Sequence, residues 1–163
     1  MPIPDKTSTL PLDKAPELHV YEAVIARITD DPILSAVIKS FHHTPFNFAP
    51  VPTQKLPAMR IEAGAGSVMS ETLSRDENTI QIGFVIEVAQ GYHGDLMNLW
   101  HALRKRISVH NDDWMALALD GVPGTMYKAM NWTQAAITYN PNLETRTLLS
   151  TAVLSVSLAI REV

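Results

Sequence analysis

The sequence predicts an α+β fold, in which two to three helices pack on one face of a single mainly antiparallel or mixed β-sheet of about four strands. Two long segments, residues 79–88 and 148–160, place an apolar side chain at every second position, which is the period of a strand with one buried face. Between them, residues 95–109 have apolar side chains at the spacing of an amphipathic helix. The length of the chain and the lack of an internal repeat predict one domain over residues 1–163.

The composition is that of a globular protein rather than a disordered one. Hydrophobic residues make up 46% of the chain and charged residues 18%, which provides enough apolar surface for a packed core. The net charge of −4 argues against binding to nucleic acid, because phosphates attract a basic surface. The lack of cysteine excludes disulfides and thiolate metal sites. We expect neither a membrane span nor a signal peptide, since no apolar run has the required length or flanks.

The first third of the chain is rich in proline and is expected to hold two helices. Residues 1–16 contain prolines without an apolar period, which predicts an extended N-terminal arm. The first helix that follows has its apolar side chains at helical spacing: Leu18, Tyr21, Val24, Ile25 and Ile28. A second helix is expected over residues 32–41, with Asp31 as its N-cap. Residues 42–57 contain four more prolines and should be extended.

The next segments predict two strands separated by a long loop. Residues 58–64 alternate weakly between apolar and polar side chains, and a loop over 64–78 separates them from a long strand at 79–89. The side chains that share the apolar face of the long strand are Ile80, Ile82, Phe84, Ile86 and Val88. Gln81 and Glu87 are expected on the exposed face, so that changing either should cost little stability.

The second half of the chain predicts a helix, an irregular segment and a hairpin. The helix at 95–109 has Asp95 at its expected N-cap, and residues 110–133 are expected to be irregular because they contain glycine and proline. Residues 134–140 and 148–160 are predicted to be the last two strands, joined by a turn at 140–142. The side chains that share the apolar face of the last strand are Ala152, Leu154, Val156, Leu158 and Ile160.

The sequence has no pattern typical of a catalytic, cofactor or metal site. None of the six histidines lies at a spacing known for metal ligands, and the adjacent His42 and His43 would point to opposite sides of an extended chain. The glycine-rich residues 64–67 are not followed by the lysine of a phosphate-binding loop. No serine stands in the surroundings of a known nucleophile. We therefore expect neither enzymatic activity nor a cofactor.

Two segments are candidates for contact with other proteins. The 64–78 loop is long for a connection between neighbouring strands, and such loops are commonly functional or disordered. Its candidate contact residues are Ser67, Met69, Glu71, Arg75 and Asp76. The segment 110–133 is rich in methionine and aromatic residues, which are enriched at protein interfaces. Its candidate interface residues are Trp114, Met115, Met126, Tyr127, Met130 and Trp132. The alternative is that these six side chains complete the core of the monomer.

The order of these elements resembles that of the tail terminator (tail completion) proteins of long-tailed bacteriophages. The resemblance covers about residues 17–163 and rests on the pattern of segments. These segments are the helix YEAVIARITDDP (21–32), the strand LPAMRIEAG (56–64) with its glycine- and serine-containing loop, TIQIGFVIEV (79–88), GDLMNLWHALRKRI (94–107) and STAVLSVSLAIREV (150–163). The N-terminal arm and the helix at 32–41 lie outside this pattern.

The resemblance implies a structural role without catalysis or a cofactor. Such a protein forms a homo-oligomer, typically a hexameric ring, on the last ring of the major tail tube protein, where it ends tail polymerisation and offers a surface to the head–tail connector or neck protein. The implied location is the tail or neck region of the virion, assembled in the host cytoplasm, with no membrane and no sequence-specific nucleic acid as partner. A head–tail connector, neck or minor tail protein and a small-molecule-binding α+β regulatory domain remain as alternatives.

Overall fold

The computed structural model describes residues 10–42, 53–63, 67–72, 75–139 and 147–161, and it confirms the predicted α+β class. The helices are α1 (Pro16–Thr29), α2 (Pro32–Val37), α3 (His93–Arg106) and α4 (Asp113–Leu119), with a 3-10 turn η1 (Thr53–Lys55). The strands are β1 (Ser40–His42), β2 (Ala58–Ala63), β3 (Ser67–Thr72), β4 (Arg75–Ala89), β5 (Thr125–Tyr139) and β6 (Thr147–Arg161).

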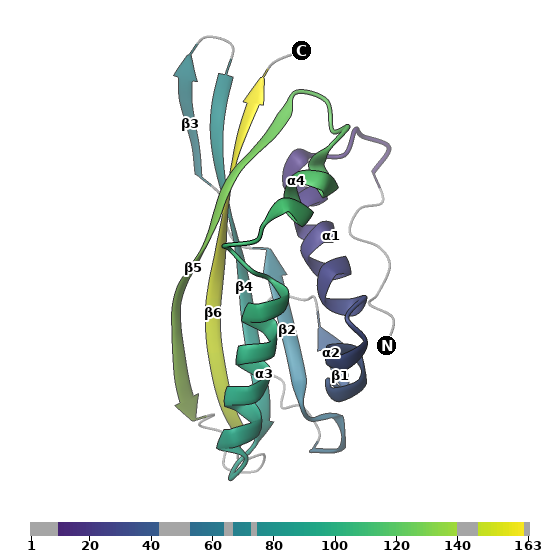
Figure 1. Ribbon diagram of the computed structural model, residues 1–163, viewed down its shortest axis with the longest axis vertical. Coiled ribbons are helices and arrows are strands. Elements are labelled where there is room, and N and C mark those ends of the chain that lie inside the picture. The colour runs from purple at the N-terminus through teal and green to yellow at the C-terminus, as the bar shows by residue number, and fades with distance from the viewer. Residues whose placement is uncertain (1–9, 43–52, 64–66, 73–74, 140–146, 162–163) are drawn as a thin grey trace.

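The described strands form one six-stranded sheet, arranged around the long strand β4 (Figure 1). One edge of β4 pairs with β6 along its whole length, from Arg75 opposite Arg161 to Ala89 opposite Thr147. The other edge pairs first with β3 and then with β2, both antiparallel. The order is therefore β3-β4-β6-β5 at one end of the sheet, here called the β3 end. At the other end, called the β1 end, the order is β1-β2-β4-β6-β5.

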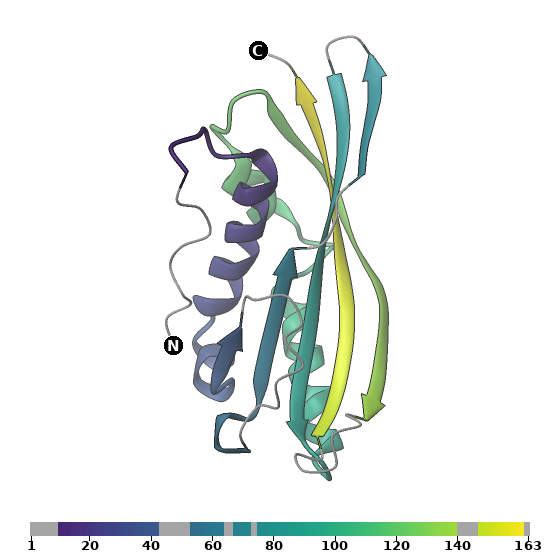
Figure 2. The same cartoon turned by 180° about the vertical axis from the view of Figure 1, so that it is seen from behind.

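The helices all lie on one face of the sheet, as the two opposite views show (Figures 1 and 2). This face carries the apolar core, in which alternate side chains of β4 and β6 pack against α1, α3 and α4. The predicted apolar face of β4 is confirmed, since the five side chains from Ile80 to Val88 are buried. The predicted face of β6 is confirmed for Ala152 to Leu158, whereas Ile160 is only partly buried.

The basic ends of α1 and α3 hold the helical layer together. Arg106 Nε donates a hydrogen bond to the carbonyl of Arg27 at 2.8 Å, and Arg27 Nε donates one to the carbonyl of Arg106 at 3.3 Å. The Arg106 guanidinium also lies 3.6 Å from the Asp31 carboxylate, next to α2. The Arg27 guanidinium lies 5.1 Å from the centre of the Trp114 ring on α4. Two arginines thus connect all four helices.

Several predicted boundaries in the helical layer are corrected. The second helix ends at Val37 rather than at residue 41, because the chain turns at Ile38 and enters the short strand β1. Asp31 is its N-cap as predicted, and its carboxylate accepts bonds from two backbone amides. The helix expected over 95–109 starts at His93 and ends at Arg106. Asp95 therefore lies in its first turn, and Tyr92 occupies the N-cap position.

The expectation of about four strands is also corrected to six, because β1 begins within the segment expected to be helical and β3 lies in the segment expected to be a loop. The 64–78 segment holds β3 and the first residues of β4, which pair as a hairpin. The 110–133 segment holds α4 and the first half of β5, which begins after Gly121 and Gly124 turn the chain with positive φ. The predicted turn at 140–142 and most of the proline-rich 42–57 segment lie outside the described residues, and residues 53–55 of that segment form η1.

Candidate functional site

The six candidate interface residues of the 110–133 segment have different surroundings. Met115 and Met130 are buried in the core of the monomer. Trp114, Tyr127 and Trp132 are partly buried and pack against the same core. Met126, at the start of β5, is 50% exposed. The segment thus mainly completes the monomer, and Met126 is the member that offers a neighbouring molecule an exposed side chain.

Trp132 anchors β5 to α3. Its indole Nε1 donates a hydrogen bond to the carbonyl of Ile107 at 3.2 Å. Its ring centre lies 5.4 Å from that of Phe84 on β4 and 5.2 Å from that of Trp100 on α3. A charged substitution at Trp132 would disturb this packing. It would therefore destabilise the core of the monomer and could not test an interface alone.

Tyr127 and Trp114 show how α4 is fixed against β5. The Tyr127 hydroxyl donates a hydrogen bond to the Asp112 carboxylate, and burial together with this bond raises the pKa of the tyrosine. The indole Nε1 of Trp114 is buried and has no hydrogen-bond partner among the residues that the structure describes. Such an orphan donor usually costs stability, so the packing of this ring outweighs an unmade hydrogen bond.

The candidate residues of the 64–78 segment lie on two paired strands instead of a loop. Ser67, Met69 and Glu71 belong to β3, and Arg75 and Asp76 begin β4. Residues 70 and 72 of β3 pair with a shift in register, which marks a bulge or irregularity. The hairpin extends beyond the helical layer at the β3 end of the sheet (Figure 1). Whether it contacts a partner stays a prediction.

Among the described strands, the sheet has an unpaired edge on each side at its β3 end. Within the described part of the chain, β3 pairs only with β4, and β5 pairs only with β6. Two register shifts interrupt β5, between Tyr127 and Ala129 and between Thr133 and Ala136. The stretch from Ala129 to Thr133 is therefore regular. Unpaired edges can add a strand from another molecule, and bulges restrict where this happens.

A buried polar cluster lies on the sheet face opposite the helices, and the sequence did not predict it. Glu87 is only 2% exposed, although its alternate position in β4 predicts an exposed side chain. Its carboxylate accepts a hydrogen bond from Thr147 Oγ1 at 2.7 Å and lies 3.8 Å from the Arg60 guanidinium. In the same layer, His42 Nε2 is 3.2 Å from Ser40 Oγ, which donates a bond to the carbonyl of Lys55. Burial is the main reason why the pKa of His42 is lowered.

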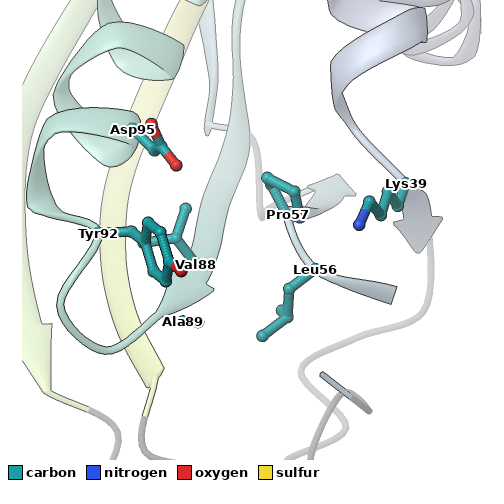
Figure 3. Close-up of a pocket in the computed structure, with 7 residues that line it drawn as sticks. All are labelled: Lys39, Leu56, Pro57, Val88, Ala89, Tyr92 and Asp95. Atoms are coloured by element: carbon teal, nitrogen blue, oxygen red, sulfur yellow. The ribbon is translucent and has the colours of Figure 1, made fainter. Parts of the chain in front are cut away.

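A groove lies between α2, the start of β2 and α3, here called the α2–α3 groove. Its larger part has a volume of about 400 Å³ and an apolar lining of Ile33, Leu34, Val37, Pro57, Leu99 and Ala102. The adjoining part, of about 270 Å³, lies between Leu56, Val88 and Tyr92, with Lys39 beside Pro57 (Figure 3). Both parts share Pro57 and Asp95. The lining is an apolar surface with few polar groups, which suits the docking of apolar side chains.

Neither a metal site nor a membrane span is found in the part of the chain that the structure describes. No three acidic, histidine or cysteine side chains in it converge as metal ligands. None of its helices is both long and apolar enough to cross a bilayer. The groups that do gather, around Glu87, are engaged with one another.

The comparisons with known proteins give a likeness to solved structures alone. No family model matches the chain, and no curated protein matches it. Among solved structures, the chain is similar to a chain of the "Virion of native gene transfer agent (GTA) particle", with 14% sequence identity and a TM-score of 0.46. The match covers 85% of this chain and 93% of that chain. A likeness at this level does not determine the function.

Proposed function

We propose that this chain is a virion structural protein that caps the tail tube of a long-tailed phage as a ring. In this role it ends tail polymerisation and provides the surface for head–tail joining. The proposal follows the resemblance of the sequence to tail terminator proteins. The single observation that carries it is that β3 and β5, on opposite sides of the β3 end, each pair with one strand only among the described residues.

The directions of these two edges suit a ring. β3 is antiparallel to β4, β4 to β6, and β6 to β5, so β3 and β5 run in opposite directions. In a cyclic ring all copies point the same way along the axis, and each uses two different patches. If the axis runs along the strands, β3 of one copy therefore meets β5 of the next in antiparallel orientation. This contact would continue the alternation of the sheet from copy to copy and cover both edges.

The bulges in β5 limit this contact to a short stretch. The two register shifts divide the described pairing of β5 into Thr125–Tyr127, Ala129–Thr133 and Ala136–Tyr139, so the longest regular stretch, Ala129–Thr133, offers about five residues for pairing. A stable interface usually buries at least about 1,000 Å², more than so few strand residues supply. The exposed Met126, just before this stretch, would add apolar area at the same edge.

The test is to place a charge at this edge and follow ring formation. Met126→Lys should give a folded protein, because the side chain is half exposed. Mixed with the tail tube protein, it should fail to form a sixfold ring in electron micrographs, and particles that carry it should have overlong or headless tails. The matched control is Met97→Lys, an equally polar change at an exposed methionine on α3. Normal rings and normal tails with Met126→Lys would exclude this edge as the interface.

A binding experiment distinguishes the terminator role from the role of a neck or head–tail connector protein. A terminator should bind the end of an assembled tail tube, whereas a neck or head–tail connector protein should bind filled heads and leave free tubes untouched. Sedimentation of the purified chain with isolated tubes and with tail-less heads distinguishes these outcomes. Binding to heads alone would favour the connector alternative.

One observation favours a different function, that of a small-molecule-binding regulatory domain. The α2–α3 groove is apolar and has Asp95 and Asn98 among its lining residues, as expected for a site that orients a ligand. A ligand would raise the melting temperature with its concentration, by mass action. Thermal scans against a panel of small amphipathic compounds test this alternative, and Ala102→Trp, which fills the groove, should abolish any such shift.

A further inference from the structure

We propose that Ser40 and His42 of β1 form an acid-sensitive latch, which holds residues 53–57, here called the η1 segment, against the β1 end of the sheet. Uptake of a proton by His42 releases the η1 segment and uncovers the groups beneath it, while the rest of the sheet stays folded. The latch lies within one chain, so this inference does not rest on the proposed function.

Two hydrogen bonds in series connect His42 to the η1 segment. Ser40 Oγ donates a bond to the carbonyl of Lys55 at 2.9 Å, and His42 Nε2 lies 3.2 Å from the same Oγ. A hydroxyl group has one proton to donate, and this proton goes to Lys55. Ser40 Oγ therefore accepts the bond from His42, and the neutral imidazole has its proton on Nε2. The nitrogen that can take up a second proton is Nδ1.

The η1 segment covers apolar groups at the β1 end of the sheet. Leu56 is 5% exposed and packs with Ala58 and Ala89 in a small cluster separate from the main core. The backbone amide of Lys39 donates a bond to the carbonyl of Pro57 at 2.9 Å, and the two residues lie beside each other in Figure 3. Release of the segment would break this bond and the bond from Ser40, and it would bring Leu56 into water.

The charges around His42 favour release once the imidazole is protonated. Arg60 on β2 is the register partner of His42, and Lys55 of the η1 segment adds a second positive charge nearby. Glu87 on β4 supplies the opposing negative charge, but this carboxylate also faces Arg60 at 3.8 Å. Burial, followed by the charges of Arg60 and Lys55, lowers the pKa of His42, and Glu87 opposes this shift. The closed arrangement therefore disfavours the protonated imidazole.

The η1 segment is the part of this cluster that can move most easily. Arg60 lies on β2, which pairs with β1 on one edge and with β4 on the other. β1 is anchored in the core by the buried side chains of Ile38 and Phe41. Lys55, in contrast, is exposed and ends a 3-10 turn of three residues, a short element with weak hydrogen-bond geometry. Repulsion from a protonated His42 should thus displace the turn rather than a strand.

The direction of the pH dependence follows from the lowered pKa of His42. The open state, in which the imidazole is in water, binds a proton more readily than the closed state. The η1 segment is therefore held most firmly above about pH 6.5, the ordinary pKa of histidine. The open fraction rises as the pH falls from there toward the lowered pKa.

Amide hydrogen exchange of the full chain tests the latch, with the Lys39 amide as the reporter because its acceptor is the carbonyl of Pro57. The protection factor, which corrects each rate for the intrinsic effect of pH, is compared at pH 7 and pH 5. It should fall at least about threefold for Lys39 in the unmodified chain, and far less in His42→Gln. The matched control is His101→Gln, at an exposed position on α3, which should behave as the unmodified chain. An equal fall in His42→Gln would overturn the proposal.

Dilute urea distinguishes local release from unfolding of the whole chain. A local opening exposes little surface, so exchange at Lys39 should hardly depend on urea. Exchange at the Val85 amide, in the central strand β4, should become faster with urea because it requires global unfolding. If Lys39 responds to urea in parallel with Val85, the η1 segment opens only when the whole chain unfolds, and the latch does not exist.

Ser40→Ala tests the hydrogen bonds of the latch at constant pH. Alanine fits the buried position of Ser40 but lacks the hydroxyl group between His42 and Lys55. The protection of Lys39 at pH 7 should fall about fivefold, as expected for the loss of one hydrogen bond. Thr133→Val removes a hydroxyl-to-carbonyl bond at an exposed position on β5 and should leave Lys39 unchanged. Unchanged protection of Lys39 in Ser40→Ala would contradict the assignment of Ser40 to the latch.

Discussion

The two faces of the sheet at its β1 end are both buried, but they are buried in different ways. On the helix side, Phe84 and Ile86 pack among aliphatic and aromatic side chains of the core. On the opposite side, Glu87 and Thr147 are just as buried and satisfy each other through a hydrogen bond. The stability that an apolar face provides depends on the volume its side chains fill, whereas the stability that a polar face provides depends on each hydrogen-bond partner being present. The comparison predicts that the two faces respond differently to the same kind of substitution.

The largest effect is expected on the apolar face. Phe84→Ala should lower the free energy of unfolding by about 3–5 kcal/mol, because it removes a fully buried ring and leaves a cavity next to Trp132. Urea unfolding measures this loss. The control is Gln81→Ala on the same strand, where the exposed side chain should contribute less than about 0.5 kcal/mol. Equal losses at both positions would mean that the stability does not depend on the volume that Phe84 fills in the apolar face.

A smaller but chemically specific effect is expected at Glu87. Glu87→Ala should cost about 1–3 kcal/mol, because it leaves the buried hydroxyl of Thr147 without its acceptor and Arg60 without its carboxylate. Glu87→Gln should cost less, since the amide oxygen can still accept the bond from Thr147. The sequence predicted that changes at Glu87 cost little stability, and the buried hydrogen bond of this side chain predicts a larger cost instead. If alanine and glutamine cost the same in urea unfolding, the hydrogen bond is not what stabilises this face.

The contrast between the faces also explains what the sequence could predict. Alternation in β4 correctly predicts which side chains share a face, but it does not reveal whether the second face is covered. The cover comes from residues distant in sequence: Lys55 accepts a bond from Ser40, and Leu56 packs against Ala58. Glu87 therefore looks like a solvated residue in the sequence, although long-range contacts bury it.

The missed elements lack a clear period for identifiable reasons. In β5, a register shift between Tyr127 and Ala129 moves the inward side chains from every second position to Tyr127 and Met130, three residues apart. β3 and the first residues of β4 are mostly polar, and their strand character comes from backbone pairing with neighbours. α4 has only seven residues and is apolar nearly all round, with Met115 and Leu119 buried. The candidate interface residues were consequently a mixture of core and surface, which composition alone does not separate.

One polar bond on the apolar face sharpens the comparison further. The Tyr21 hydroxyl on α1 donates a buried hydrogen bond to the carbonyl of Ile61 on β2 at 3.1 Å. Tyr21→Phe keeps the ring and should cost about 1 kcal/mol, the usual net value of such a bond. Tyr21→Ala, which also removes the ring, should cost several times more in the same unfolding experiment. If Tyr21→Phe lowers the free energy of unfolding more than Glu87→Gln does, polar contacts stabilise the helix side at least as much as the opposite side.

The smallest effect expected is a dependence of stability on pH that belongs to the polar face alone. Burial, with Arg60 and Lys55 nearby, lowers the pKa of His42, while the charge of Glu87 opposes this shift. Because the folded state then binds a proton less readily than the unfolded state, the unfolded chain takes up more protons as the pH falls below about 6.5. The contribution of His42 to stability is therefore fully present above that pH and is lost as the pH falls toward the lowered pKa. His42→Gln cannot take up this proton, so its unfolding free energy should fall less steeply between about pH 7 and pH 5 than that of the unmodified chain.

His101→Gln, at an exposed position on α3, is the control and should keep the steeper dependence. If His42→Gln leaves the steepness unchanged, the polar face does not make the sheet sensitive to pH, and the two faces differ only in their tolerance of lost partners.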